Sequence, residues 1–198
     1  MRHTRWPSLI LLLLVAWIGA ARAADVYALD QTDGSIEFTI HHFGPLSSRG
    51  IFHRFRANLT LDPVNPYQSR IGVTMEAGSG EVDRPGATEI LLSSDFFDAV
   101  QFPHIRFTSI RITRQGPGHY VVEGSVEIRG ITKPFALDTR LVSAHADPRS
   151  QAEIAEFVAT GTLQRASFGM TADPMLISNA IDITIHARLA LGASFHVG

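Results

Sequence analysis

The chain has 198 residues, with 17 lysines and arginines against 19 aspartates and glutamates, and it contains no cysteine. The absence of cysteine excludes disulfides, thiolate metal sites and lipid attachment at a cysteine. Nucleic-acid binders usually carry a basic excess that neutralises phosphates, so the slightly acidic balance argues against a nucleic-acid partner.

Residues 1–23 are expected to be a secretory signal and not part of the fold. Arg2 and Arg5 precede an apolar run from Leu9 to Ile18, and the segment ends in Ala21-Arg22-Ala23, with small residues where a signal peptidase cleaves. The apolar run is ten residues long, whereas a membrane-spanning helix needs about 20. We therefore predict an exported domain over 24–198 with no stable membrane span, and export without disulfides suggests the periplasm of a bacterium.

Alternation of apolar and polar residues predicts eight β-strands in the exported domain. They lie at 36–40, 55–61, 71–75, 105–112, 120–128, 135–141, 157–163 and 181–187. Clean alternation and short turns rich in Gly, Pro, Asn and Asp are typical of antiparallel neighbours. Eight antiparallel strands can close into a barrel and so remove their exposed edges. A two-sheet sandwich is the alternative architecture.

The stretch from Leu91 to Ile112 changes period and predicts the one short helix of an otherwise all-β chain. Ser94 is a cap candidate, Asp95 and the apolar Phe96, Phe97 and Val100 follow at helical spacing, and Pro103 stops the pattern. The helix is therefore expected over 95–102, between the third and fourth predicted strands. In the strand that follows, the apolar positions shift at Ser109-Ile110, which predicts a β-bulge.

Several motifs in the exported domain occur in the order and spacing of a known family. They are Tyr27-Ala28-Leu29-Asp30, His41-His42-Phe43-Gly44, Gly50-Ile51-Phe52, Asp95-Phe96-Phe97-Asp98, Arg129-Gly130-Ile131-Thr132-Lys133-Pro134, and Phe168-Gly169 after Arg165. Together they resemble the YceI family over nearly the whole domain. The resemblance implies an extended, lipocalin-like barrel of the Gram-negative periplasm that holds a long polyisoprenoid in its lumen.

The interior of an eight-stranded barrel is just wide enough to be filled by its own side chains or to hold one slender ligand. The residues alone leave both options open, and the resemblance favours a cavity. Its lining would come from the apolar strand faces and from the predicted helix, which is expected to cover the entrance. The predicted lining residues are Phe38, Ile40, Phe52, Phe55, Met75, Phe96, Phe97, Phe102, Phe107, Val122, Phe135, Phe157 and Ile183.

His42 and Arg165 are the predicted head-group residues, since histidine and arginine donate well to phosphate and quinone oxygens. We predict no metal site, because the adjacent His41 and His42 point to opposite faces of a strand and no HExxH spacing occurs. We also predict no catalytic residue, since the chain has no Gly-x-Ser-x-Gly elbow.

The predicted function is that of an exported binding protein for a polyisoprenoid lipid, such as an isoprenoid quinone or a prenyl phosphate, with no other cofactor. Its role would be transport, storage or protection of the envelope under stress. Two alternatives stay open: a periplasmic hydrolase acting on a lipid or ester, and a structural or stress protein with a filled core. A homodimer also stays open.

Overall fold

The computed structural model describes residues 24–62, 65–148 and 152–191. Strands make up most of this part of the chain, together with one six-residue helix, α1 (Ala87–Leu92), and three short 3-10 turns, η1 (Pro66–Gln68), η2 (Ala77–Ser79) and η3 (Arg165–Phe168). The strands are β1 (Asp25–Asp30), β2 (Gly34–His42), β3 (Ser47–Phe52), β4 (Phe55–Leu61), β5 (Arg70–Glu76), β6 (Gly80–Val82), β7 (His104–Gly116), β8 (His119–Ile128), β9 (Ile131–Ala146), β10 (Glu153–Gln164) and β11 (Ile177–Leu191).

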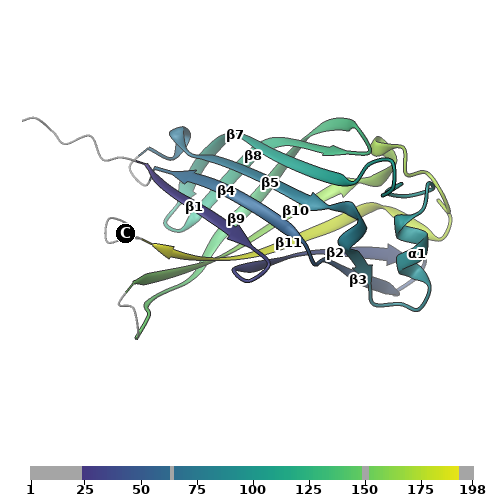
Figure 1. The fold of residues 1–198 in the computed structure, drawn as a ribbon, viewed down its shortest axis with the longest axis horizontal. Coiled ribbons are helices and arrows are strands. Elements are labelled where there is room, and N and C mark those ends of the chain that lie inside the picture. Colours follow the sequence, from purple (N-terminus) through teal and green to yellow (C-terminus); the bar gives the residue numbers. More distant parts are fainter. Residues whose placement is uncertain (1–23, 63–64, 149–151, 192–198) are drawn as a thin grey trace, which may run out of the picture.

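The eleven strands form one antiparallel sheet that curls into a lipocalin-like half-barrel. Their order is β1-β4-β5-β7-β8-β9-β10-β11-β2-β3-β6, so β1 and β6 are its edges. Figure 1 shows the long strands running along the molecule, with α1 at one end and the start of β1 and the end of β11 at the other.

All eight predicted strands are present, but the predicted count of eight is wrong. The three further strands are β1, β3 and β6. None of them alternates strongly enough to be recognised: β3 begins with two serines and an arginine, β6 has only three residues, and the apolar residues of β1 are consecutive. The closed eight-stranded barrel is therefore replaced by an eleven-stranded curled sheet with two edges.

The predicted helix over 95–102 is also misplaced, because α1 ends before it. Ser93 ends α1 in an extended conformation, and its carbonyl then accepts the N–H groups of Phe96 at 3.1 Å and Asp98 at 2.8 Å. Asp98 adopts a positive φ of 47°, which interrupts helical geometry. Phe96 and Phe97 are nevertheless buried. A series of turns that hydrogen-bond to the Ser93 carbonyl therefore buries these two rings, as a helix would have done.

The predicted β-bulge is confirmed in β7. The register between β7 and β8 shifts between Ser109 and Arg111, and Ile110 points outward with 68% of its surface exposed. The buried Ser109 hydroxyl accepts a hydrogen bond of 2.8 Å from the backbone N–H of Ile71 on β5. At the bulge, the Ser109 hydroxyl therefore takes the place of a backbone carbonyl as the acceptor for the N–H of Ile71.

One glycine of the inner face is required by an aromatic ring on the neighbouring strand. Gly50 on β3 pairs with Phe38 on β2, and a Cβ at Gly50 would overlap the Phe38 ring. The ring can thus lie flat on the sheet, with only 4% of Phe38 exposed.

We expect Gly50→Ala to lower the free energy of unfolding by about 1–3 kcal/mol, because the added methyl forces the Phe38 ring off its site. Urea denaturation measures this loss. The matched control is Gly72→Ala on β5, where a Cβ would meet nothing within 4 Å, and a neutral or slightly stabilising effect is expected there. Equal losses of unfolding free energy at the two positions would contradict the idea that Gly50 is needed to make room for the Phe38 ring.

Candidate functional site

Two cavities lie end to end inside the curled sheet. The larger has a volume of about 480 Å³ and is bordered by α1, and we call it the near chamber. The smaller, the far chamber, has a volume of about 200 Å³ and is bordered by the inner face of β4 and by the β1–β2 turn. Known ligand pockets measure about 300–1,000 Å³, so the near chamber alone is large enough for a small-molecule ligand.

Aromatic and aliphatic side chains dominate the lining of the near chamber. The ring centroids of Phe38 and Phe52 are 5.4 Å apart, and those of Phe52 and Phe97 are 5.8 Å apart, so a row of rings runs from β2 to the turns after α1. Few polar side chains join this lining; they are His42, Ser48, Arg84, Arg165 and Asp173. Such a surface offers dispersion contacts along its length and hydrogen bonds at only a few points.

The structure places twelve of the thirteen predicted lining residues around the chambers. Phe107 borders both chambers, and Phe102 borders neither, since its ring lies beside Gly130 in the β8–β9 turn. The far chamber receives Phe55, Val122 and Phe157. The near chamber receives Phe38, Ile40, Phe52, Met75, Phe96, Phe97, Phe135 and Ile183.

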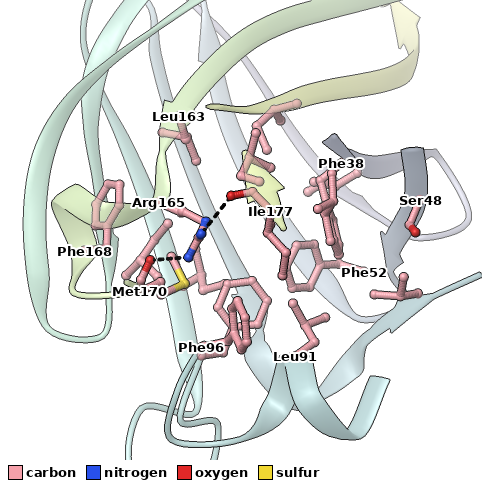
Figure 2. Close-up of a pocket in the computed structure, with 18 of the residues that line it drawn as sticks. Phe38, Ser48, Phe52, Leu91, Phe96, Leu163, Arg165, Phe168, Met170 and Ile177 are labelled. Carbon is pink, nitrogen blue, oxygen red and sulfur yellow. Dashed lines mark hydrogen bonds between the residues drawn. The ribbon is translucent and has the colours of Figure 1, made fainter. Parts of the chain in front are cut away.

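Arg165, one of the two predicted head-group residues, is a buried cation in the wall of the near chamber. Its side chain donates three hydrogen bonds to backbone carbonyls: Nη1 to Met170 at 2.7 Å, Nη2 to Ile177 at 2.9 Å, and Nε to Ser178 at 3.0 Å. Figure 2 shows the guanidinium among Met170, Ile177 and Phe96. Arg165 thereby fastens the loop between η3 and β11, a role that its sequence position did not reveal.

The charge of Arg165 is only partly balanced by its surroundings. Burial lowers the pKa of the guanidinium, and the Asp173 carboxylate acts in the opposite direction. The guanidinium carbon lies 5.9 Å from the centroid of the Phe96 ring, within cation–π range. Among the described residues no carboxylate forms a direct ion pair with Arg165. Because a guanidinium has N–H groups beyond the three used here, an anionic or carbonyl oxygen in the chamber would complement it.

His42, the other predicted head-group residue, lies at the end of β2 and forms a pair with a serine. Its Nε2 is 2.8 Å from Oγ of Ser48 on β3, and Ser48 is only 2% exposed. Both residues line the near chamber, and Figure 2 shows Ser48 and Arg165 on opposite sides of the view. The two head-group candidates are therefore separate polar positions. Ser48 itself was missed, because a serine in a polar strand gives no sequence signal for an inward position.

Exposed apolar side chains border the near chamber where it meets solvent. Phe43, Leu46, Ile90 and Leu176 line the chamber and are also between 55% and 83% exposed. The backbone N–H of Phe43 donates to the carbonyl of Leu176 at 3.1 Å, which joins the β2–β3 turn to the loop before β11. The mouth of the chamber is thus an apolar rim made by three segments.

The described ranges contain no cluster of three or more histidine, aspartate or glutamate side chains arranged to hold a metal ion. In the same ranges, no helix has the length and hydropathy needed to cross a membrane.

Comparison with models of protein families shows which family the chain belongs to. The model of the YceI-like domain matches residues 27–189. The chain belongs to the YceI-like family. A UPF0312 protein of Pectobacterium carotovorum is 30% identical to this YceI-like protein over 180 residues, which cover 90% of the chain and 92% of the relative. A UPF0312 protein of Serratia proteamaculans is 30% identical over 169 residues, covering 84% and 86%. The family predicted from the sequence motifs is therefore confirmed.

Solved structures share the fold of this YceI-like protein. BcnA of Burkholderia cenocepacia superposes with a TM-score of 0.72 at 19% identity, covering 81% of this chain and 99% of BcnA. The YceI protein of Campylobacter jejuni gives a TM-score of 0.68 at 21% identity, covering 77% and 90%. A polyisoprenoid binding domain from Saccharophagus degradans, implicated in plant cell wall breakdown, gives 0.56 at 8% identity, covering 86% and 100%. At these identities the likeness concerns the fold.

Proposed function

We propose that this YceI-like protein is a periplasmic binding protein that holds the chain of a polyisoprenoid lipid in its interior. The observation that carries the proposal is the near chamber, an apolar cavity of about 480 Å³ that meets solvent at an apolar rim. The polyisoprenoid binding domain from S. degradans, which shares the fold, supports the choice of ligand. The periplasm follows from the proposed signal over 1–23, which lies outside the described residues.

The energetics of such a chamber favour a hydrocarbon chain. Each buried methylene contributes about 0.8 kcal/mol of gross transfer free energy. After ordering costs, the yield for larger ligands falls to about 0.3 kcal/mol per heavy atom, which still permits tight binding of a chain with many carbons. A polar ligand would find few hydrogen-bond partners along the row of phenylalanine rings and would lose its water.

The polar positions of the lining narrow the choice of head group. The buried guanidinium of Arg165 and the His42–Ser48 pair line the chamber, and groups of this kind can donate hydrogen bonds to ligand oxygens, which supports a polar head group there. We therefore propose a head group that carries acceptor oxygens, either a prenyl phosphate or an isoprenoid quinone. Transport, storage and protection of such a lipid all require this binding step.

The same serine–histidine pair supports a second candidate, a hydrolase for lipid esters. A nucleophile and a base within hydrogen-bond reach are the minimal pair for acyl transfer, and 2.8 Å between Ser48 Oγ and His42 Nε2 meets that distance. Turnover of a prenyl ester above a no-protein control, lost in Ser48→Ala, would establish the hydrolase. Uptake of intact ester without turnover would favour the binding protein.

Native mass spectrometry of the purified 24–198 protein, followed by organic extraction, tests the proposed binding. We expect an adduct that extracts as a prenyl lipid, or uptake of added solanesol and of undecaprenyl phosphate by protein that arrives empty. Stronger uptake of the phosphate would support a role for the polar positions of the lining, Arg165 and the His42–Ser48 pair, in holding the head group. Protein that carries no lipid and takes up neither probe would contradict the proposal and favour a stress or structural role.

A further inference from the structure

A ring of five side chains separates the two chambers and belongs to both of them. The five come from five different strands spread around the curl, β2, β5, β7, β9 and β11. We call this ring the waist; it consists of Ile36, Val73, Phe107, Leu137 and Ile185. Since the same side chains border both chambers, the two chambers adjoin at the waist, and we call them together the lumen.

Phe107 is the largest member of the waist, and two features hold its ring against the wall. Its ring lies over Gly124 of β8, where an added Cβ would come within 2.7 Å of Cζ. It also meets Phe135 edge to face, with centroids 6.2 Å apart and planes at 89°. Phe135 in turn lies over Gly161 of β10, again 2.7 Å from the position of a Cβ. The two glycines therefore let the bulky rings of Phe107 and Phe135 lie flat against the neighbouring strands.

The far chamber is suited to the end of a chain and not to a whole ligand. Its volume of about 200 Å³ is below the range of about 300–1,000 Å³ found for pockets of drug-sized ligands. The small side chains of Ala57 and Ala159 border it on β4 and β10, and Asp62, which follows β4, borders it at the end of the molecule where β1 begins. A hydrocarbon chain that crosses the waist would thus gain further apolar contact in the far chamber.

We propose that the waist makes this lumen select polyisoprenoids by chain length, with Phe107 as the residue that sets the division. The inference rests on the proposed lipid binding. A short prenyl chain occupies the near chamber only, whereas a long chain passes the Phe107 ring and buries its end in the far chamber. The additional burial makes the long chain the tighter ligand.

Two probes of different length and the same head group test this selection: farnesol for the short chain and solanesol for the long chain. Ala159→Leu fills the far chamber without touching the near chamber. We expect it to weaken solanesol binding by about tenfold, the equivalent of about two buried methylenes, and to leave farnesol binding unchanged. Ala57→Leu repeats the test from the opposite wall, in case one variant does not fold. Affinities come from titration followed by native mass spectrometry.

The matched control is Thr160→Leu, which adds a leucine at the next residue of β10, where the side chain is exposed. It should bind both probes as the unaltered protein does, and thermal unfolding confirms that each variant is folded. Unchanged solanesol affinity in folded Ala159→Leu or Ala57→Leu would overturn the selection by length. Equal affinities of the unaltered protein for farnesol and solanesol would also overturn it, while lipid binding itself would stand. Binding of neither probe would instead remove the proposed function.

Discussion

Replacing Arg165 by methionine is expected to lower the free energy of unfolding by about 3 kcal/mol, because it leaves backbone carbonyls without a donor, at about 1–3 kcal/mol for each buried group. Arg165 is 4% exposed and donates to Met170, Ile177 and Ser178. These bonds hold the loop that leads into β11, so the loss should include local opening at that end of the near chamber. Urea denaturation measures the stability, and amide hydrogen exchange over 169–178 measures the opening.

Two further variants separate the geometry of Arg165 from its charge. Arg165→Lys keeps the positive charge but replaces the planar fork of donors by a single ammonium, so it should recover only part of the stability. Arg106→Met removes an arginine of β7 that is about half exposed and lies 3.4 Å from Glu127, and an exposed pair of this kind contributes about 0–1 kcal/mol. Full recovery with lysine, or an equal loss at Arg106, would contradict the fastening role of Arg165.

Phe97→Asp is expected to reduce solanesol uptake by tenfold or more. Phe97 is 9% exposed, lines the near chamber and contacts the ring of Phe52. An ionised carboxylate at this place keeps its hydration shell, and its water would occupy the path of the hydrocarbon chain. The amount of bound lipid is measured by native mass spectrometry after incubation with excess solanesol.

The control for Phe97→Asp lies three residues further along the same segment. Val100 is 96% exposed and borders neither chamber, so Val100→Asp introduces the same charge without entering the lumen. It should leave uptake unchanged, and Phe97→Leu should keep most of it. If Phe97→Asp is folded and still takes up solanesol, the segment after α1 is not part of the lipid site.

Alternation predicted the strands whose inner residues are apolar and whose outer residues are polar, as in β2, β4 and β7. It could not predict β3 or β6, because β3 carries Ser48 inward and β6 is only three residues long. The positions of Phe96 and Phe97 in the interior were predicted correctly, although the backbone that brings them there is a set of turns and not a helix. Burial is specified by the side chains, whereas the local backbone depends on hydrogen bonds at Ser93.

The candidate site was predictable to the extent that its residues are apolar and lie on alternating strands. The role of Arg165 was not, because its partners are backbone carbonyls, which the sequence does not identify. The division of the lumen was equally hidden. The rings of Phe107 and Phe135 lie over Gly124 and Gly161 of neighbouring strands, and that relation arises only from the register of the sheet.

The two edges of the sheet have a mechanical consequence. A barrel closed by hydrogen bonds has a fixed circumference, because any widening must break a ladder. In the sheet that the described residues form, β3 and β4 are not paired with each other; they are joined only by the two linking residues His53 and Arg54. The His53 N–H donates a hydrogen bond of 3.2 Å to the Ser79 carbonyl. Because no ladder pairs β1 with β6 in the described residues, widening the sheet between these two edges would break no ladder hydrogen bond. Entry of the proposed prenyl chain would therefore not require a strand to unfold.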